Sequence, residues 1–299
     1  MSASLADPGL IHQLQPRRAP TARGPVEYVE FGEGPVVVAL HGAMGGWDQS
    51  LLLAQAIGPA GYRYLAVSRP GYLGTPLAAA QSAAAQGELL AALLDELGVA
   101  TAGVMAVSGG GPAALALALG QPARCRALVL ASTCASPVTT PIPWSFKLMK
   151  FLARRAWFAA RFRRKAARNL AAVAARSIRD PEILARTLGD PEVWPLFQTM
   201  LLSTFDHMGE RLDGTENDIA VSQGQAAPLE EVAAPVLVVH GTADPLLPFA
   251  AHAAVFQARL PRAELLAVPG GEHAAIFTHR SLVRPRVAEF LARHLPAAA

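Results

Sequence analysis

Charged residues, aromatic residues and cysteines are scarce in this sequence. Asp, Glu, Lys and Arg make up 16% of the 299 residues, while 52% are hydrophobic. Such a chain can bury a sizeable core, which excludes an intrinsically disordered protein. No apolar run approaches the roughly 20 residues that cross a bilayer, and residues 1–23 lack the pattern of a secretory signal. The composition predicts a globular, cytoplasmic protein.

The chain has two cysteines, Cys125 and Cys134, and nothing in their surroundings suggests chemistry. They flank residues 128–130, an apolar run typical of a buried strand, so they would lie roughly 30 Å apart at ~3.3 Å per residue. That separation excludes a disulfide between them. No neighbouring residues provide the spacing of a metal site. We therefore expect two free thiols without a functional role, and neither a metal nor a cofactor.

Acidic residues are absent between Glu96 and Asp180, a segment that holds half of the chain's lysines and arginines. Six cations recur there at helical spacings: Lys147, Lys150, Arg154, Arg161, Lys165 and Arg168. Five apolar residues lie largely on the other side of the same helix: Leu148, Phe151, Leu152, Phe158 and Phe162. The pattern predicts one basic amphipathic helix. It either turns its charges to water with its apolar face over a pocket, or docks on an anionic membrane or steers acidic substrates. Nucleic-acid binding is not expected, because no recognition motif accompanies the charge.

Strand and helix patterns alternate along most of the chain. Residues 26–31 and 36–40 read as strands joined by a Gly- and Pro-rich turn, which predicts an opening hairpin. Helices are then predicted over 47–57, 83–97 and 112–120, and strands over 64–67, 103–107 and 127–131. This alternation is typical of an α/β fold with a mostly parallel sheet covered by helices on both faces.

The strand pattern stops between residues 136 and 227, where only helical stretches appear. It then returns as strand, helix, strand and helix over 235–239, 250–260, 264–268 and 282–294. Because the sheet needs these later strands to complete its core, we interpret 136–227 as an inserted helical lid, or cap. The predicted organisation is an N-terminal extension over 1–25, a core over 26–135 and 228–299, and the lid between the two core segments.

The most informative stretch is residues 104–112, an apolar run that ends in Ser108 and breaks at once into three glycines. It predicts a strand, a tight turn and a helix, which would lift Ser108 above the sheet edge with the helix N-terminus behind it. Ala106 and Gly110 flank the serine as A-x-S-x-G, and small residues suit so strained a turn. Ser108 is therefore a candidate nucleophile, the alternative being an ordinary strand-to-helix turn.

A serine nucleophile needs a base, and His273 is the best-placed histidine, in the loop after the last predicted strand. Asp244 follows the preceding strand and is the candidate acid that would orient His273. An aspartate before a proline is also common where a helix begins, so the alternative is that Asp244 only initiates the helix that follows. Glu272 is a rival acid, although adjacent side chains usually diverge. The order along the chain is serine, aspartate, histidine.

These features together resemble the α/β-hydrolase superfamily, in its serine esterase and lipase branch, from about residue 26 onward. The resemblance extends to 41–46, which is similar to the family's H-G-x-x-G loop. It implies an oxyanion hole made by the backbone N–H groups of Ala43 and Gly109, with Met44 as the alternative donor if the loop is offset by one residue. His41 is then expected to organise that loop. Residues 68–72 resemble the family's D-x-x-G loop with serine in place of aspartate, and we interpret them as structural.

The resemblance implies a hydrolase that cleaves a carboxylic ester of a small, largely apolar substrate through an acyl-enzyme intermediate. Serine rather than aspartate at the turn argues against dehalogenases and epoxide hydrolases. Amide, thioester, lactone and carbon–carbon bond hydrolysis stay open. An aminopeptidase is the second candidate, because six lid carboxylates could hold a substrate amine: Glu182, Glu192, Asp206, Glu210, Glu216 and Asp218. A non-enzyme alternative is a ligand receptor or a protein that binds anionic surfaces on the same fold.

Overall fold

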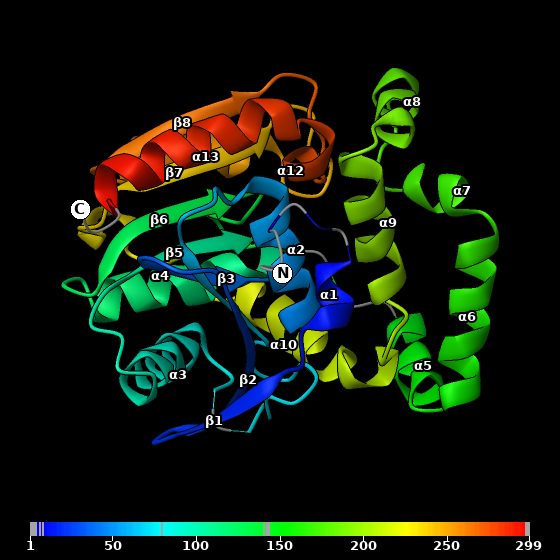
Figure 1. Cartoon of the computed structure of the whole chain (residues 1–299), viewed down its shortest axis with the longest axis horizontal. Coiled ribbons are helices and arrows are strands. Elements are labelled where there is room, and N and C mark those ends of the chain that lie inside the picture. Colours follow the sequence, from blue (N-terminus) through cyan, green and yellow to red (C-terminus); the bar gives the residue numbers. More distant parts are fainter. Residues whose placement is uncertain are drawn as a thin grey trace.

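The computed structural model describes residues 5, 7, 9–78, 80–139, 141 and 144–296 of the chain. Their centre is an eight-stranded sheet in the order β1-β2-β4-β3-β5-β6-β7-β8, which Figure 1 shows in the left half of the molecule. The strands are β1 (Arg17–Thr21), β2 (Gly24–Phe31), β3 (Val36–Leu40), β4 (Arg63–Val67), β5 (Ala102–Val107), β6 (Cys125–Ala131), β7 (Val236–Gly241) and β8 (Ala263–Val268). β1 and β2 run antiparallel to their neighbours and the other pairings are parallel, which confirms the predicted α/β fold class.

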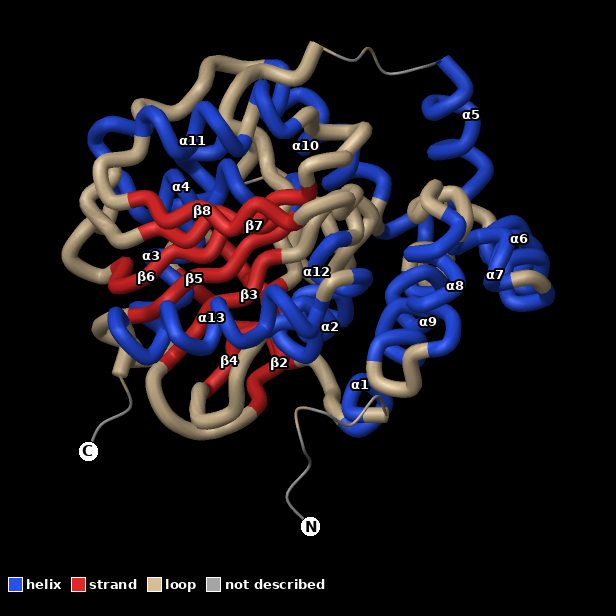
Figure 2. Tube along the Cα trace, turned by 90° about the horizontal axis from the view of Figure 1, so that it is seen from above, coloured by secondary structure: helices blue, strands red, loops and turns tan. Residues whose placement is uncertain are grey.

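Helices cover both faces of the sheet, as predicted, so the central strands are buried on both sides (Figure 2). One face packs against α3 (Ala83–Glu96), α4 (Gly111–Gly120) and α11 (Ala253–Arg259). The other packs against α2 (Trp47–Ile57), α12 (Ala275–Thr278) and α13 (Arg280–His294). The short helix α1 (Leu10–Gln13) lies beside α2. Cys125 and Cys134 are both free thiols, as expected.

The predicted hairpin between residues 26–31 and 36–40 is wrong. β2 pairs with β1 on one edge and with β4 on the other, so β4 separates it from β3. The turn between β2 and β3 passes closely over the start of β4: a Cβ on Gly32 or Gly34 would lie 2.3 Å from the carbonyl oxygen of Tyr62 or Gly61. Both glycines have positive φ angles, 81° and 111°. The hairpin of this sheet is β1–β2, one element earlier.

The predicted N-terminal extension also needs a correction, because β1 lies within residues 1–25 and forms the edge of the sheet. β1 is short, and its pairing with β2 leaves only one of its own edges unpaired. Residues 1–4, 6 and 8 of the extension, and residues 297–299 of the predicted core, lie outside the described residues.

Where the sequence predicts a lid, the regular structure of the described residues is helical. Between β6 and β7 follow α5 (Trp144–Ala153), α6 (Ala156–Arg168), α7 (Leu170–Ala174), α8 (Pro181–Gly189), α9 (Val193–Ser203) and α10 (Leu212–Gln223), with short 3₁₀ turns η2 (Met208–Glu210) and η3 (Leu229–Glu231). Figures 1 and 2 show α5 to α9 beside the sheet rather than on either of its faces. Among the described residues, none of these or the other helices has the length and apolar character needed to cross a membrane.

The predicted single basic helix is wrong, because the chain breaks at Arg155 into two helices, α5 and α6. Arg155 has an extended backbone, with φ −92° and ψ 115°. The break lies where the chain packs closely on η2: a Cβ on Gly209 would lie 2.8 Å from the carbonyl oxygen of Ala153. Ala153 and Ala159, on either side of the break, are both buried with Met208. These contacts on both sides of Arg155 hold the bend between α5 and α6.

Candidate active site

Ser108 sits on a sharp turn between β5 and α4, as predicted. Its φ angle is +50°, in the left-handed region that side chains other than glycine rarely adopt. The turn is closely packed: a Cβ on Gly110 would lie 2.7 Å from the carbonyl oxygen of His41, and Thr133 Oγ1 donates to the Ser108 carbonyl at 2.6 Å. These neighbours keep the strained backbone in place and direct the Ser108 side chain away from the sheet.

The structure brings Ser108, His273 and Asp244 together, although 165 and 29 positions of sequence separate the serine and the aspartate from the histidine. His273 Nε2 lies 3.0 Å from Ser108 Oγ, and His273 Nδ1 lies 2.8 Å from Asp244 Oδ2. The three residues follow β5, β7 and β8, whose carboxyl ends share one edge of the sheet. In this arrangement Nδ1 donates its proton to Asp244, which leaves Nε2 free to accept the proton of Ser108.

Asp244 is buried and its carboxylate is fully engaged. Oδ1 accepts the backbone N–H groups of Leu246 and Leu247 at 2.9 and 3.0 Å, while Oδ2 accepts from His273. Burial by itself raises the pKa of this carboxyl, but the hydrogen bonds from His273 and from the two amides outweigh it and hold the pKa below its ordinary value. Asp244 is therefore ionised in the neutral range. The alternative that it merely begins a helix does not account for its bond to His273.

Glu272, the rival acid, does not contact His273. Its Oε1 accepts the backbone N–H groups of Arg179 and Asp180 at 2.6 and 3.1 Å. These amides belong to the connection between α7 and α8, so Glu272 ties the loop that carries His273 to the helical insertion. The neighbouring carboxyl group is thus a link between two parts of the chain, a role that the sequence did not indicate.

The two predicted oxyanion donors lie side by side next to Ser108. A Cβ on Gly109 would lie 3.5 Å from the backbone nitrogen of Ala43, and one on Gly42 would lie 3.0 Å from Ser108 Cβ. Within the described part of the chain, neither the Ala43 nor the Gly109 N–H donates to another protein atom. The N–H of Met44, the alternative donor, is already bonded to Thr215 Oγ1 at 3.0 Å. The geometry favours Ala43 over Met44.

A buried ion pair that the sequence did not reveal lies behind the oxyanion loop, residues 41–46. Arg69 donates from Nη1 to Asp218 Oδ1 at 2.7 Å and bonds Oδ2 through Nη2, while the Tyr72 hydroxyl donates to Oδ2 at 2.5 Å. Asp218 comes from α10 and Arg69 from the 68–72 loop, 149 positions away. Burial opposes the charge of Arg69, but Asp218 more than compensates and raises the Arg69 pKa. Asp218 is therefore committed to this pair rather than to a ligand.

Arg69 also holds the oxyanion loop directly. Its Nε donates to the carbonyl of His41 at 2.9 Å and its backbone N–H donates to His41 Nε2 at 3.0 Å. His41 Nδ1 in turn donates to the carbonyl of Gly42 at 2.6 Å, and the imidazole packs edge-on against Tyr72. Burial, and then the charge of Arg69, lowers the pKa of His41 well below its ordinary value. His41 is a neutral side chain that organises the loop, as the sequence indicated.

We expect Asp218→Asn to lower the free energy of unfolding by about 3–5 kcal/mol, because it leaves the Arg69 charge buried without a counterion. Urea unfolding followed by circular dichroism measures the change. Glu30→Gln is the matched control: Glu30 accepts from Arg63 in a bidentate pair, but both side chains are about one-third exposed. That control should lose no more than ~1 kcal/mol. Equal stabilities of the two variants would contradict the assigned importance of the Arg69–Asp218 pair.

Comparison with known proteins identifies the family of this chain. The family model described as the alpha/beta hydrolase fold matches residues 35–280. The chain belongs to this family. A solved alpha/beta hydrolase fold protein from Nakamurella multipartita is 32% identical, with a TM-score of 0.77 over 93% of this chain and 99% of that one. A thermophilic esterase from Thermogutta terrifontis, solved with malate bound, has a TM-score of 0.65 at 20% identity, over 94% of this chain and 99% of that one.

Curated relatives of this alpha/beta hydrolase match shorter segments. An uncharacterized hydrolase, YcgS, from Bacillus subtilis is 30% identical over 131 residues, which are 44% of this chain and 46% of that protein. The matched segment thus spans about half the length of this relative. Membership of the family assigns the alpha/beta hydrolase fold to this chain.

This alpha/beta hydrolase has a cavity of about 370 Å³ beside Ser108. Its wall is mainly apolar and includes Leu53, Val107, Met200, Ile276 and Phe277. The helical insertion contributes Arg176, Ser177, Arg179 and Met200. Glu272 is the acidic residue of this wall among the described residues. The cavity can take a small apolar group next to the serine, with two arginines from the insertion at its edge.

None of the six carboxylates proposed to hold a substrate amine lines this cavity, so that basis for an aminopeptidase is wrong. Five are engaged elsewhere: Glu192 with Arg280, Asp206 with Arg163, Glu210 with His207, Glu216 with Lys150, and Asp218 with Arg69. Glu182 is exposed on α8. These acidic residues of the insertion therefore pair with basic residues of the insertion or of the core, or face solvent.

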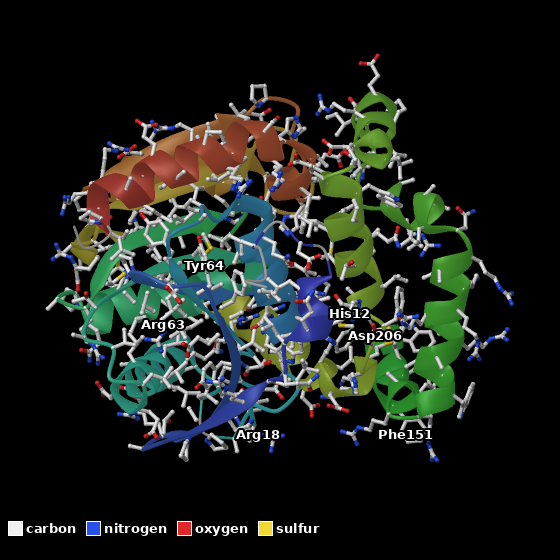
Figure 3. All side chains as sticks on the ribbon, in the orientation of Figure 1. His12, Arg18, Arg63, Tyr64, Phe151 and Asp206 are labelled. Atoms are coloured by element: carbon white, nitrogen blue, oxygen red, sulfur yellow. The ribbon has the colours of Figure 1, made fainter. Side chains whose placement is uncertain are left out.

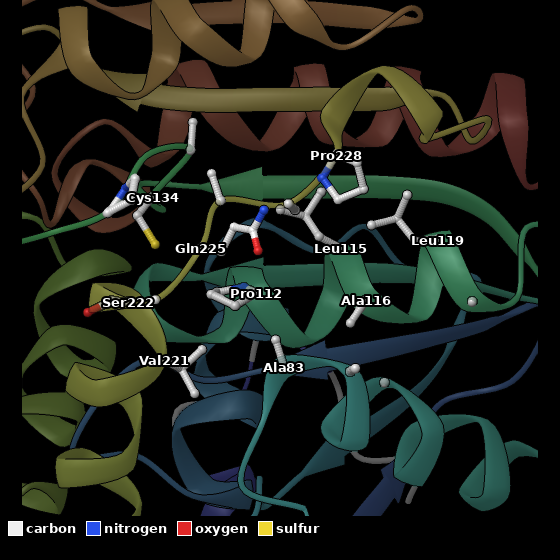
Figure 4. Close-up of a pocket in the computed structure, with 18 of the residues that line it drawn as sticks. Ala83, Pro112, Leu115, Ala116, Leu119, Cys134, Val221, Ser222, Gln225 and Pro228 are labelled. Atoms are coloured by element: carbon white, nitrogen blue, oxygen red, sulfur yellow. The ribbon is translucent and has the colours of Figure 1, made fainter.

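A larger cavity, of about 850 Å³, lies between α3, α4 and the chain that follows α10 (Figure 4). Pro112, Leu115 and Leu119 of α4 line it together with Val221 and Gln225. Ser108 and His273 are not part of its wall. The site that contains the predicted residues is therefore the smaller of these two cavities.

Proposed function

We propose that this protein is a serine hydrolase that cleaves a carboxylic ester of a small, largely apolar acyl group through an acyl-enzyme intermediate. The observation that carries the proposal is the hydrogen-bonded chain from Ser108 to His273 to Asp244, with Ser108 on a strained turn next to two unengaged N–H groups. Nucleophile, base, orienting acid and oxyanion donors are the components of acyl transfer, and a reaction of this type needs no metal or cofactor.

In the proposed mechanism, Ser108 Oγ attacks the ester carbonyl carbon while His273 Nε2 accepts its proton. The carbonyl oxygen becomes an oxyanion that accepts from the N–H groups of Ala43 and Gly109. Collapse of this intermediate breaks the bond to the alcohol, which leaves with the proton from His273. Water then attacks the acyl-enzyme, gives its proton to His273, and releases the acid as the proton returns to Ser108. Asp244 stabilises the imidazolium throughout.

The cavity volume predicts a preference for short acyl chains, measured with p-nitrophenyl acetate, butyrate, hexanoate and decanoate. Met200 stands in the cavity wall, so Met200→Ala should move the optimum toward longer chains by enlarging the space beside Ser108. Met149→Ala is the matched control, because Met149 on α5 packs in a different cluster. A decanoate optimum in the unmodified protein, or the same shift in both variants, would contradict the proposed substrate size.

The same series should include a lactone and an aminoacyl substrate, because the Ser108 geometry suits each of these acyl compounds. The highest kcat/KM then assigns the bond that is cleaved. A ligand receptor on this fold would bind substrate with a turnover far below that of a typical esterase, whereas the proposal expects kcat within the ordinary enzyme range of about 1–10³ s⁻¹ for the preferred ester.

A further inference from the structure

Large apolar side chains are exposed together on one part of the molecule, the hairpin formed by α5 and α6. Five of the seven most exposed large hydrophobic residues in the described chain lie on these two helices: Trp144, Leu148, Phe151, Trp157 and Phe162. Trp144 is 78% exposed, Trp157 63% and Phe151 62%. On α5 the exposed residues recur at positions i, i+4 and i+7, so they form one face of the helix. Gathered exposed aromatic residues of this kind mark an interaction surface.

These residues are not the core-facing side of the hairpin. The inner side is a separate set, in which Ala153 and Ala159 are buried with Met208 and Leu212. Nor does the outer side cover the Ser108 cavity, because none of the described residues in its wall belongs to α5 or α6. The expectation that the apolar face lies over the pocket is therefore wrong. Figures 1 and 2 place α6 at the edge of the molecule remote from the sheet, and Figure 3 shows Phe151 at its lower edge.

The same hairpin is strongly basic, with nine lysines and arginines and no acidic residue between 144 and 168. Two of them have acidic partners: Lys150 bonds Asp213 at 2.6 Å and also Glu216, and Arg163 bonds Asp206 at 2.5 Å. The others form no ion pair within the described chain: Lys147, Arg154, Arg155, Arg161, Arg164, Lys165 and Arg168. Four of these line one shallow depression on α6, namely Arg161, Arg164, Lys165 and Arg168.

An exposed aromatic residue and unpaired cations share one face of α6. On α6, Trp157 is followed at helical spacings by Arg161, Arg164 and Arg168. We propose that the outer surface of the α5–α6 hairpin docks on an anionic lipid membrane. Tryptophan and phenylalanine rings insert favourably at the level of the lipid headgroups, and neighbouring arginines bind the acidic phosphates.

The positive charge of this surface favours an anionic membrane over a second copy of this chain as the docking partner. Two such hairpins facing each other would bring together two sets of seven unpaired cations, which repel. An anionic membrane instead provides both the negative charge and the apolar layer that this surface lacks. Juxtaposed cations contribute on the order of 1 kcal/mol each near such a membrane, and the attraction falls off within a Debye length.

The first test is co-sedimentation with phosphatidylcholine vesicles with and without phosphatidylglycerol. We expect binding at low salt only when phosphatidylglycerol is present, and its loss at 1 M salt, where the Debye length is about 3 Å. The triple variant Arg161→Gln, Arg164→Gln, Arg168→Gln should bind at least about tenfold more weakly. The matched control, Arg17→Gln, Arg126→Gln, Arg262→Gln, has the same net charge, replaces exposed arginines outside the hairpin, and should bind like the unmodified protein.

The second test addresses the aromatic residues. Tryptophan emission should shift to the blue with phosphatidylglycerol vesicles, and Trp144→Phe, Trp157→Phe should abolish the shift while co-sedimentation persists, because Trp47 and Trp194 lie elsewhere. Trp144→Ser, Phe151→Ser, Trp157→Ser should lose co-sedimentation. Unchanged circular dichroism and unchanged hydrolysis of a short soluble ester would show that each variant folds.

Membrane docking is wrong if the unmodified protein ignores phosphatidylglycerol vesicles at low salt, an outcome that would favour an acidic protein surface as the occupant. It is also wrong if the hairpin triple variant and its control lose binding equally, since the attraction would then follow net charge alone. Both tests measure binding and can be repeated with Ser108→Ala, so their outcome is independent of the proposed hydrolase activity.

Discussion

Ser108→Ala should reduce kcat/KM for the preferred ester by about a thousandfold or more. The variant removes the attacking oxygen but leaves the two oxyanion donors and the cavity, which alone retain only a small part of the rate enhancement. Ester hydrolysis under single-turnover and steady-state conditions measures the loss. A fluorophosphonate should add one covalent mass to the unmodified protein and none to the variant, because it reacts with an activated serine.

Ser177→Ala is the matched control, since Ser177 lines the same cavity but has no histidine partner among the described residues. It should keep both the fluorophosphonate label and most of the activity. Alanine at position 108 keeps the strained backbone and its bond from Thr133, so the fold should be retained. Wild-type turnover in Ser108→Ala would show that the proposed nucleophile is wrong.

Asp244→Asn should lower kcat/KM by about a thousandfold, because an amide in place of Oδ2 no longer stabilises the imidazolium and favours the wrong tautomer of His273. Glu272→Gln is the matched control. Its amide oxygen can still accept the N–H groups of Arg179 and Asp180, so activity should be retained. The opposite result, an active Asp244→Asn with an inactive Glu272→Gln, would transfer the acid role to Glu272.

The pH profile provides a separate test of the histidine base. A protonated base cannot accept the serine proton, so kcat/KM should fall as the pH is lowered from the neutral range. His41 and His240 cannot produce this step, because burial lowers the pKa of each below its ordinary value and keeps it neutral there. Asp244 stays ionised across the same range, since its pKa is lowered too. A flat profile between about pH 5 and 9, with chemistry rate-limiting, would contradict a histidine base.

Local patterns in the sequence were enough to predict the elements that carry the site. The apolar run before Ser108 and the glycines after it indicated strand β5, the turn and helix α4, because strain and close packing at such a turn admit few residue types. Asp244 and His273 could be assigned to loops after β7 and β8, and parallel strands present their carboxyl ends at one edge. Their meeting with Ser108 follows from that topology.

Pairings between distant segments could not be predicted in this way. The backbone hydrogen-bonding groups along a strand edge are the same in every sequence, so they do not indicate whether β2 pairs with β3 or with β4. The turn at Gly32 and Gly34 therefore suggested a hairpin that the fold does not form. The contact between Arg69 and Asp218 joins the oxyanion loop to α10 across 149 positions, and no local pattern marks either residue for the other.

The amphipathic stretch from 144 to 168 separates the two kinds of information most clearly. Composition and helical spacing determined by themselves that this part of the chain is helical, basic and rich in aromatic residues, because those properties depend on neighbours three and four positions away. Only the tertiary structure decided that it breaks at Arg155, which of its apolar residues meet Met208, and which remain exposed. Helical spacing indicates which residues share a face but not which face is buried, because that choice depends on the surfaces that the rest of the chain presents to the helix.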